Sequence, residues 1–236
     1  MDILRAEAPS YGIHLADAQL AQFEHYLTLI REWNERVNLV SDADPEVVQR
    51  RHMLESLALG AALREREVLR PDSRVIDVGA GAGFPGIAIK IAWPTIHLTL
   101  LEATAKKTAF LSAAVEALGL EDTPVHTARA EGAAHDATLR GVFDLVLARA
   151  VAPLPALLEL TLPFARVGGR LATPKGSRAR DEIAAASHAA SVLHAKLFSV
   201  RLNVPGPEQT LVVALKQAPT PPDYPRRPGV PAKSPL

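Results

Sequence analysis

A glycine-rich turn that directly follows a short apolar run constrains this chain more than any other feature. Residues 74–78, Arg-Val-Ile-Asp-Val, have the length and β-branched content of a buried strand, and Gly79, Gly81 and Gly83 come directly after it. A helix is expected to begin near Pro85-Gly86. Glycine permits positive φ and lets a ligand lie against bare backbone, and the start of the next helix offers free N–H groups. The pattern therefore predicts a strand-turn-helix unit of the kind that binds nucleotide-like cofactors.

From Ser73 onward, apolar runs of strand length alternate with helical patterns, which is typical of βαβ units in a parallel sheet. The predicted strands span residues 74–79, 97–103, 125–129, 143–149 and 169–173, and the helices between them span 86–92, 106–118, 154–166 and 179–195. Two further strands, 197–204 and 211–216, follow with no helix between them, which implies a hairpin and one antiparallel strand. We therefore predict an α/β fold with the seven-stranded, mostly parallel, Rossmann-like sheet of class I methyltransferases.

The sequence before and after these predicted strands has a different residue pattern. Residues 14–40 carry one apolar stripe at helical spacing with Asp17 as the expected N-cap, and a second helix is expected from Asp44-Pro45 to near Gly60. Residues 219–236 contain seven prolines and little apolar material, so we predict an extended or disordered arm. The predicted parts are an N-terminal helical extension (residues 1–72), a methyltransferase domain (73–218) and a Pro-rich basic C-terminal arm (219–236).

The net charge of zero hides an asymmetry along the chain. Residues 170–236 hold ten Lys or Arg against four Asp or Glu, and the other 169 residues hold sixteen against twenty-two. A basic C-terminal third fits a polyanionic partner, and it fits ordinary charge scatter equally well. No apolar run approaches the roughly 18 to 20 residues that cross a bilayer, and residues 1–7 lack the basic and apolar regions of a secretory signal. We therefore expect no membrane partner and a cytoplasmic location.

Two cofactor classes compete for the glycine turn, because Gly81–Gly86 also matches the dinucleotide pattern G-x-G-x-x-G. Counting from Gly79 at the strand end, Phe84 stands where the third glycine of that pattern belongs, and it is bulky where a pyrophosphate needs close backbone approach. Asp77 would repel a pyrophosphate, but it could accept a hydrogen bond from the cationic α-amino group of a methionine moiety. These features favour S-adenosylmethionine, and a nicotinamide-dependent dehydrogenase is the more distant alternative.

The ends of the next strands supply further candidate cofactor residues. Glu102 ends the second strand, where a carboxylate accepts hydrogen bonds from both ribose hydroxyls. After the third strand, Ala130 could offer backbone contacts to adenine, and Glu131 could accept from its exocyclic amine. Arg149 ends the fourth strand among apolar neighbours, which favours a site role over a structural ion pair. This candidate catalytic residue could bind the methionine carboxylate, a target phosphate or guanine O6.

Two absences narrow the choice of methyl acceptor. The chain has no cysteine, which excludes the thiolate nucleophile that carbon-5 pyrimidine methylation requires. The fourth strand runs into Ala148–Val151 and carries no Asn/Asp-Pro-Pro-aromatic motif, which exocyclic-amine methyltransferases use. The acceptors left are already nucleophilic or need only positioning, such as guanine N7 with its free lone pair. His52, His97 and His126 have no metal-ligand spacing, so no metal site is predicted.

Several motifs together resemble one known family over nearly the whole chain. They are Trp33-Asn34 with Val37-Asn38-Leu39, the run from Arg51 to Leu57, Asp77–Gly86, Leu101–Thr104 with Lys106-Lys107, Ala148–Ala150, Lys175-Gly176 and the ending Tyr224–Leu236. With these motifs the chain resembles the bacterial glucose-inhibited division protein B family, the guanine-N7 methyltransferases of 16S ribosomal RNA. It departs from that family at Glu55, where Asp is usual, and in Pro207–Thr210, which lacks an Arg often found before the last strand.

This resemblance implies an activity and a set of contacts. The implied reaction is methyl transfer from S-adenosylmethionine to N7 of a guanine in 16S ribosomal RNA, as naked RNA or in a small-subunit assembly particle, by an enzyme expected to be a monomer. The implied cofactor contacts are Gly79, Phe84, Glu102, Ala103, Thr104, Ala130, Glu131 and Arg149, to which the turn adds Asp77 and Gly81. The expected RNA contacts are Arg129 and Lys175, with Arg178, Arg180 and the tail. A small-molecule methyltransferase and a non-catalytic cofactor-binding module are the alternatives.

Overall fold

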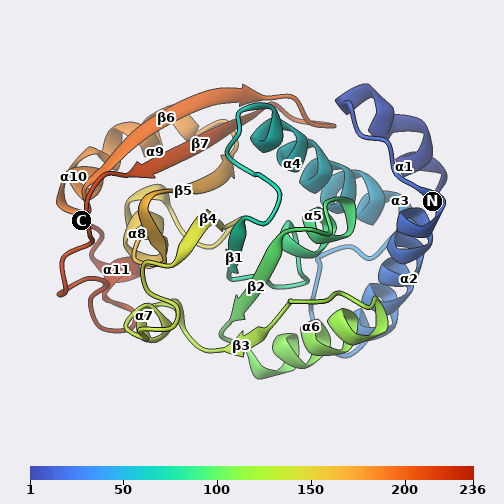
Figure 1. The fold of residues 1–236 in the computed structure, drawn as a ribbon, viewed down its shortest axis with the longest axis horizontal. Coiled ribbons are helices and arrows are strands. Elements are labelled where there is room, and N and C mark those ends of the chain that lie inside the picture. The colour runs from blue at the N-terminus through green and yellow to red at the C-terminus, as the bar shows by residue number, and fades with distance from the viewer.

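Seven strands form one sheet in the order β3-β2-β1-β4-β5-β7-β6 (Figure 1). The computed structural model describes residues 1–236. The strands are β1 (Arg74–Val78), β2 (His97–Glu102), β3 (Val125–Thr127), β4 (Phe143–Leu147), β5 (Ala165–Lys175), β6 (Ala195–Leu202) and β7 (Gln209–Lys216). β7 runs antiparallel to β5 and β6, and the other neighbouring pairs are parallel. The predicted α/β fold, a mostly parallel seven-stranded sheet with one antiparallel strand, is confirmed.

The predicted elements differ most from the observed ones where apolar residues continue past the end of a strand or helix. β3 ends at Thr127 and β4 at Leu147, each two residues early, because the following residues turn into loops at the carboxyl edge of the sheet. The helix predicted over 154–166 ends at Thr161, and β5 already begins at Ala165. The helix predicted over 179–195 is divided into α9 (Ala179–Ala185) and α10 (Ser187–Val192).

Helices cover both faces of the sheet (Figure 1). Because side chains alternate along a strand, Val75 and Asp77 of β1 face one side, and Ile76 and Val78 face the other. The core on the first face includes α2 (Asp17–Asn34), α4 (Glu55–Glu65), α5 (Gly86–Ala92) and α6 (Ala105–Ala117). The core on the second face includes α7 (Ala130–Ala133), α8 (Leu154–Thr161) and α10. The central strands are therefore buried on both faces, and in such a sheet ligands bind at the carboxyl ends of the strands.

The N-terminal extension contains more helical elements than predicted. α1 (Asp2–Glu7) and a 3-10 turn, η1 (Ala8–Tyr11), precede α2, and α3 (Pro45–Val47) leads through a π-helical stretch, η2 (Val48–Leu54), into α4. Asp44 caps α3, and its carboxylate accepts from the backbone N–H groups of Glu46 and Val47. The N-cap of α2 is Ala16, so Asp17 is the first helical residue and not the predicted cap.

Gly60 does not end α4, contrary to the prediction, and the helix continues to Glu65. A Cβ at Gly60 would lie 2.1 Å from the Trp93 ring, so glycine is needed for close packing of α4 against the end of α5. A glycine inside a helix costs about 1 kcal/mol relative to alanine, which this packing offsets.

The C-terminal tail, residues 219–236, packs against the protein, so the prediction of an extended or disordered arm is wrong. It runs beside α7 and α8 and includes a short helix, α11 (Val230–Lys233), in which Pro231 is buried (Figure 1). Arg140 donates hydrogen bonds to the backbone carbonyls of Thr220, Pro221 and Tyr224. Proline removes a backbone donor but keeps the carbonyl acceptor. Guanidinium groups can therefore hold a proline-rich tail that contributes few apolar side chains.

Candidate cofactor site

The glycine turn connects β1 to α5 at the carboxyl edge of the sheet. Gly79, Gly81 and Gly83 have φ angles of +72°, +57° and +89°, a region that glycine adopts without strain. The backbone N–H of Gly79 donates to the carbonyl of Leu101 (2.8 Å), which ties the turn to the end of β2. A Cβ at Gly83 would lie 2.6 Å from the hydroxyl oxygen of Tyr26. The glycines are therefore required both by the turn and by its close approach to α2.

The carboxylate of Asp77 connects the end of β1 to the start of α5, on the far side of the glycine turn. Its side chain is fully buried, and Oδ2 accepts from the backbone N–H of Gly86 (2.9 Å) at the start of α5. Oδ1 is buried without a hydrogen-bond partner, and burial raises the pKa of Asp77 to about 7. The structure places the Asp77 carboxylate at the start of α5, and its contact with the methionine α-amino group stays a prediction. Because strand side chains alternate, Asp77 points toward the helices on the first face.

A cavity of about 350 Å³ opens beside the turn, in the size range of small-molecule sites. Its walls come from the ends of β1, β2 and β4, the loop before α7, α8 and the tail. The predicted site residues that line it are Gly79, Glu102, Ala103, Arg129, Ala130, Glu131 and Arg149. The other predicted site residues do not line it: Asp77, Gly81, Phe84, Thr104 and Lys175.

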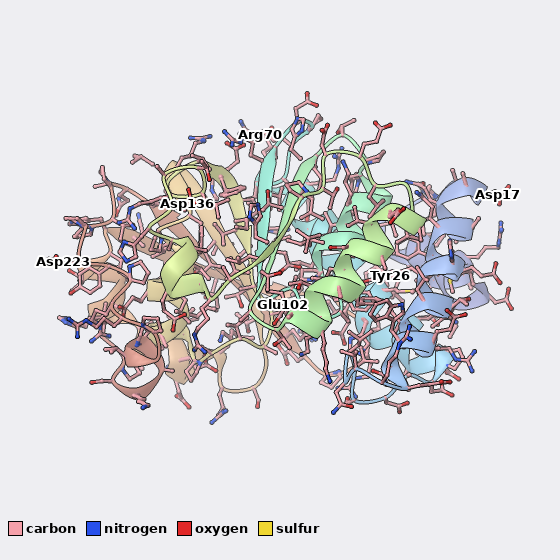
Figure 2. The ribbon with its side chains drawn as sticks, turned by 90° about the horizontal axis from the view of Figure 1, so that it is seen from below. Asp17, Tyr26, Arg70, Glu102, Asp136 and Asp223 are labelled. Atoms are coloured by element: carbon pink, nitrogen blue, oxygen red, sulfur yellow. The ribbon has the colours of Figure 1, made fainter.

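Glu102 lies at the end of β2, in the middle of the molecule in Figure 2. Its Oε2 accepts from the backbone N–H of Gly81 (3.1 Å), and its Oε1 accepts from that of Thr104 (2.8 Å). A carboxylate offers about four lone-pair positions, so each oxygen keeps one for a ligand hydroxyl. The predicted ribose acceptor therefore also braces the glycine turn, and this contact accounts for Gly81 and Thr104.

Glu131 and Arg129 border the cavity beside the end of β3. Glu131 Oε1 accepts from the backbone N–H of Gly229 in the tail (2.8 Å) and lies 3.6 Å from Nη2 of Arg129. Burial raises the pKa of Glu131, but the Gly229 hydrogen bond and the Arg129 charge outweigh it and bring the pKa below its usual value. The carboxylate therefore stays ionised and can accept from an amine. The side chain of Arg129 is 63% exposed, which leaves it available to a ligand outside the cavity.

Arg149 borders the opposite end of the cavity, after β4, and is surrounded by groups from η2 and α4. Its Nη2 lies 3.0 Å from Nδ1 of His52, and its Nη1 donates to the carbonyl of Arg51 (3.3 Å) and lies 3.7 Å from Oε2 of Glu55. Burial and the charge of Arg149 lower the pKa of His52 to about 4, so His52 is neutral and Nδ1 accepts. Burial also lowers the pKa of Arg149, and the Glu55 carboxylate opposes that shift.

Phe84 packs against Arg149 and His52 on the side away from the cavity, and it does not line the cavity. Its ring stacks on His52, with 5.2 Å between ring centres, and the Arg149 guanidinium lies 5.7 Å from the ring centre of Phe84. The structure places Phe84 behind Arg149, and its predicted cofactor contact stays a prediction. The two departures from the family pattern meet here, because Glu55 and Gln209 line the same small pocket beside Arg149.

Residues 19–211 match the GidB family model, described as rRNA small subunit methyltransferase G. The chain belongs to this family. It is 44% identical to ribosomal RNA small subunit methyltransferase G of Roseiflexus castenholzii over the whole of both chains. It is 43% identical to the protein of the same name from Chloroflexus aggregans, over 96% of this chain and 94% of that one. A putative O-methyltransferase from Klebsiella pneumoniae has the same fold, with a TM-score of 0.55 at 16% identity over 82% of this chain and 90% of that one.

As a GidB protein the chain is a methyltransferase that uses S-adenosylmethionine, and the cavity fits that cofactor. Bare backbone at Gly79 faces it, where an added Cβ would lie 2.8 Å from Val151. Ala150, at the cavity wall, has φ +56°, a region that non-glycine residues rarely adopt, and this bend brings Val151 back over the turn. Two carboxylates at the cavity wall, Glu102 and Glu131, offer acceptors for ribose and adenine. The family predicted from the motifs is confirmed.

The sequence did not predict the role of Tyr26 in this GidB protein. Tyr26 is fully buried, and its hydroxyl donates to the carbonyl of Ala82 inside the glycine turn. It lies three residues after Phe23 on the apolar stripe of α2, and a buried tyrosine needs a partner for its hydroxyl. That spacing is the signal that could have identified it. No group of three or more His, Asp or Glu side chains is placed to hold a metal ion.

Lys175 is mostly buried and paired in this structure, and its predicted RNA contact stays a prediction. Its side chain is 11% exposed, and Nζ lies 2.8 Å from Oε2 of Glu182 and donates to the carbonyl of Ala152 (3.0 Å). Ala152 lines the cavity, so Lys175 positions the loop after β4. Arg178 and Arg180, in contrast, are exposed.

Proposed function

We propose that this GidB protein transfers a methyl group from S-adenosylmethionine to N7 of a guanine in 16S ribosomal RNA. The observation that carries the proposal is the order of the strand ends along the cavity. Because β3, β2, β1 and β4 are consecutive neighbours, Ala130, Glu102, Gly79 and Arg149 follow one another along its wall. This order suits the adenine, ribose and methionine parts of the cofactor in turn, with Arg149 at the reacting end.

The residues at the reacting end fit an acceptor that needs no general base. S-adenosylmethionine supplies an electrophilic methyl group, and the lone pair of guanine N7 can attack it while the carbon–sulfur bond breaks and its electrons stay on sulfur. N7 carries no proton, so none has to be removed. His52 accepts from Arg149 and is not directed at the cavity as a base. Arg149 is left to orient the target through a phosphate or guanine O6, which is catalysis by positioning.

Transfer of tritium from labelled cofactor to small ribosomal subunits and to naked 16S ribosomal RNA tests this function. We expect label in guanine, with strand scission at the labelled nucleotide after borohydride and aniline treatment. Glu102→Ala should lower the transfer, and Arg70→Ala, on the opposite edge of the sheet (Figure 2), is the matched control. Label in another base would contradict the N7 assignment. Label only in small molecules would favour a small-molecule methyltransferase, and no transfer would favour a non-catalytic module.

We further propose that the protein acts as a cytoplasmic monomer on ribosomal RNA or on a small-subunit particle. Exposed Arg129, Arg178 and Arg180 lie on segments that follow β3 and β5 and supply positive charge for a phosphate backbone. None of the helices is both long and apolar enough to cross a membrane. Light scattering of the purified protein should give the mass of one chain, and a dimer mass would contradict the monomer.

A further inference from the structure

The strongest anchor of the C-terminal tail is one buried carboxylate on α8. The side chain of Glu159 is 0% exposed. Arg226 donates to it through its backbone N–H (2.8 Å), Nε (2.9 Å) and Nη2 (2.7 Å). The same Nη2 also donates to the carbonyl of Ser234 (2.8 Å). A forked guanidinium–carboxylate pair fixes orientation as well as position, so one side chain secures the segments before and after α11.

The segment that this anchor holds forms part of the cofactor cavity. The backbone N–H of Gly229 donates to Glu131, and Ala232 of α11 lines the cavity directly. Leu160, which follows Glu159 on α8, lines the adjoining wall. Undocking residues 219–236 would therefore remove the Ala232 wall and break the hydrogen bond between Gly229 and Glu131.

We propose that the tail completes the binding site for the adenosine half of the cofactor, with Arg226 as the positioning residue. The proposal rests on the assignment of this cavity to S-adenosylmethionine. Adenine is bound by apolar walls and a few directed polar groups. Ala232 and Leu160 supply such walls, and Glu131 supplies the acceptor. The placement of Glu131 depends on Gly229, and the placement of Gly229 depends on the Arg226–Glu159 pair.

Tail docking and cofactor binding are then thermodynamically coupled. A ligand that touches the docked tail stabilises the docked form, and docking raises the affinity for the ligand by the same factor. The coupling acts through side chains that the ligand does not touch, because Arg226 and Glu159 do not line the cavity. A change at Arg226 should therefore alter cofactor affinity without altering any group in contact with the cofactor.

Calorimetry on the full-length Arg226→Gln variant tests this with three ligands: S-adenosylmethionine, S-adenosylhomocysteine and 5′-methylthioadenosine. The last contains the adenosine half without the amino-acid part. We expect all three to bind about tenfold more weakly, within the range typical of coupled sites. Arg226→Lys keeps the charge but loses the fork and should give a smaller loss. Arg227→Gln is the matched control, because Arg227 is the exposed neighbouring arginine, and it should bind all three ligands like the wild type.

Hydrogen exchange of the wild-type protein gives a second readout that does not depend on any variant folding. Amide exchange in residues 219–236 should slow when 5′-methylthioadenosine or S-adenosylmethionine is added. In Arg226→Gln the same segment should exchange faster, while β1, β2 and β4 exchange at wild-type rates. A role confined to general stability would instead change exchange throughout the sheet.

Three outcomes would overturn the inference. The first is unchanged affinity of Arg226→Gln for all three ligands in a preparation whose wild type binds them. The second is an equal loss in Arg227→Gln. The third is weaker RNA binding with unchanged cofactor affinity, which would assign the tail to RNA. If the wild type itself binds none of the three ligands, the proposed cofactor function fails, and that result is distinguishable from the others.

Discussion

Two segments outside the sheet, α2 and the C-terminal tail, border the cofactor site. α2 contacts the glycine turn, and the tail lines the cavity, through different kinds of interaction. In Figure 2, Tyr26 of α2 lies on one side of Glu102, and Asp223 of the tail lies on the other. On the N-terminal side, Tyr26 is fully buried and donates directly into the glycine turn. On the C-terminal side, Arg226 is 28% exposed and acts on the cavity through Gly229 and Glu131.

This difference between α2 and the tail indicates which segment can leave the site without unfolding the protein. Tyr26 belongs to the same buried cluster as Leu100 and Leu147 of the sheet, so α2 cannot leave without exposing that face. Tyr224 and Leu236 of the tail pack only at the margin of the second core, and hydrogen bonds and one ion pair hold the rest of the tail. Water can replace these polar contacts when the tail undocks. Changes on the N-terminal side should therefore affect global stability, and changes on the C-terminal side should affect ligand affinity.

The largest effect is expected at Tyr26. Tyr26→Ala removes a buried aromatic ring and should lower the free energy of unfolding by about 3–5 kcal/mol. Tyr26→Phe keeps the ring but leaves the Ala82 carbonyl without its donor, and should cost about 1–3 kcal/mol. Urea unfolding followed by circular dichroism measures both. Phe198→Ala, at an aromatic residue that is 47% exposed, is the control, and a Tyr26→Ala loss no larger than the control's would contradict this side of the comparison.

The buried Asp77 and the half-buried His52, both beside the turn, should also give opposite pH dependences. The pKa of Asp77 is raised from 3.8 to about 7, so folding takes up a proton between these values and stability falls as pH rises. The pKa of His52 is lowered from 6.5 to about 4, so folding releases a proton and stability rises with pH. In the parent protein the two slopes oppose each other between about pH 4 and 6.5.

Single variants should reveal each slope. Relative to the parent, the unfolding free energy of Asp77→Asn should rise by up to about 1.4 kcal/mol per pH unit near pH 5, and that of His52→Gln should fall by a similar amount. Denaturant titrations at several pH values provide the measurement. Parallel pH profiles for parent and variants would show that neither group is held in its shifted state.

Glu102 lies between α2 and the tail, and its substitution should mainly affect the affinity for the cofactor. Glu102→Ala removes the ribose acceptor together with the bonds to Gly81 and Thr104. We expect the free energy of cofactor binding to weaken by about 1–3 kcal/mol, the value of lost hydrogen bonds to a charged group. Calorimetry measures this, with Glu65→Ala on the exposed end of α4 as control. Unchanged affinity would refute the ribose assignment.

On the C-terminal side, Arg226→Gln should cost less stability than Tyr26→Ala. A permanently buried pair loses about 3–5 kcal/mol when one partner is removed, but tail undocking lets Glu159 regain water, so we expect roughly 1–2 kcal/mol. The same urea titration gives the value. A cost equal to that of Tyr26→Ala would mean that the tail is as much a part of the core as α2.

The smallest effect is expected at Arg129, which faces outward beside the tail contact. Arg129→Ala should weaken RNA binding modestly and reduce the salt slope of log K by about one. Arg70→Ala is the control, because Arg70 is similarly exposed (64%) on the opposite edge of the sheet. Filter binding at several salt concentrations measures both, and equal slopes for Arg129→Ala and Arg70→Ala would exclude an RNA contact at Arg129.

The fold and the position of the site were predictable because they follow from local patterns. Strand-length apolar runs and helical periodicity identified all seven strands, and the final helix-free pair identified the antiparallel one. The residues that line the cavity were predictable where they end a strand, as Glu102 does, or lie within two residues of a strand end, as Arg149 does. The place of Asp77 outside the cavity lining was not predictable, because Asp77 lies within a strand, where the alternation of side chains decides which way a carboxylate points.

The sequence by itself determined the class of fold, the glycine turn and the carboxylates at the strand ends, because each depends on residues within a few positions of one another. Only the tertiary structure decided that the tail docks, since its main contact joins Arg226 to Glu159, 67 residues away. The prediction of an extended or disordered arm rested on the low apolar content of residues 219–236. Docking instead draws on a desolvated, forked ion pair and on carbonyls held by Arg140, and such contacts exist only once distant segments have been brought together.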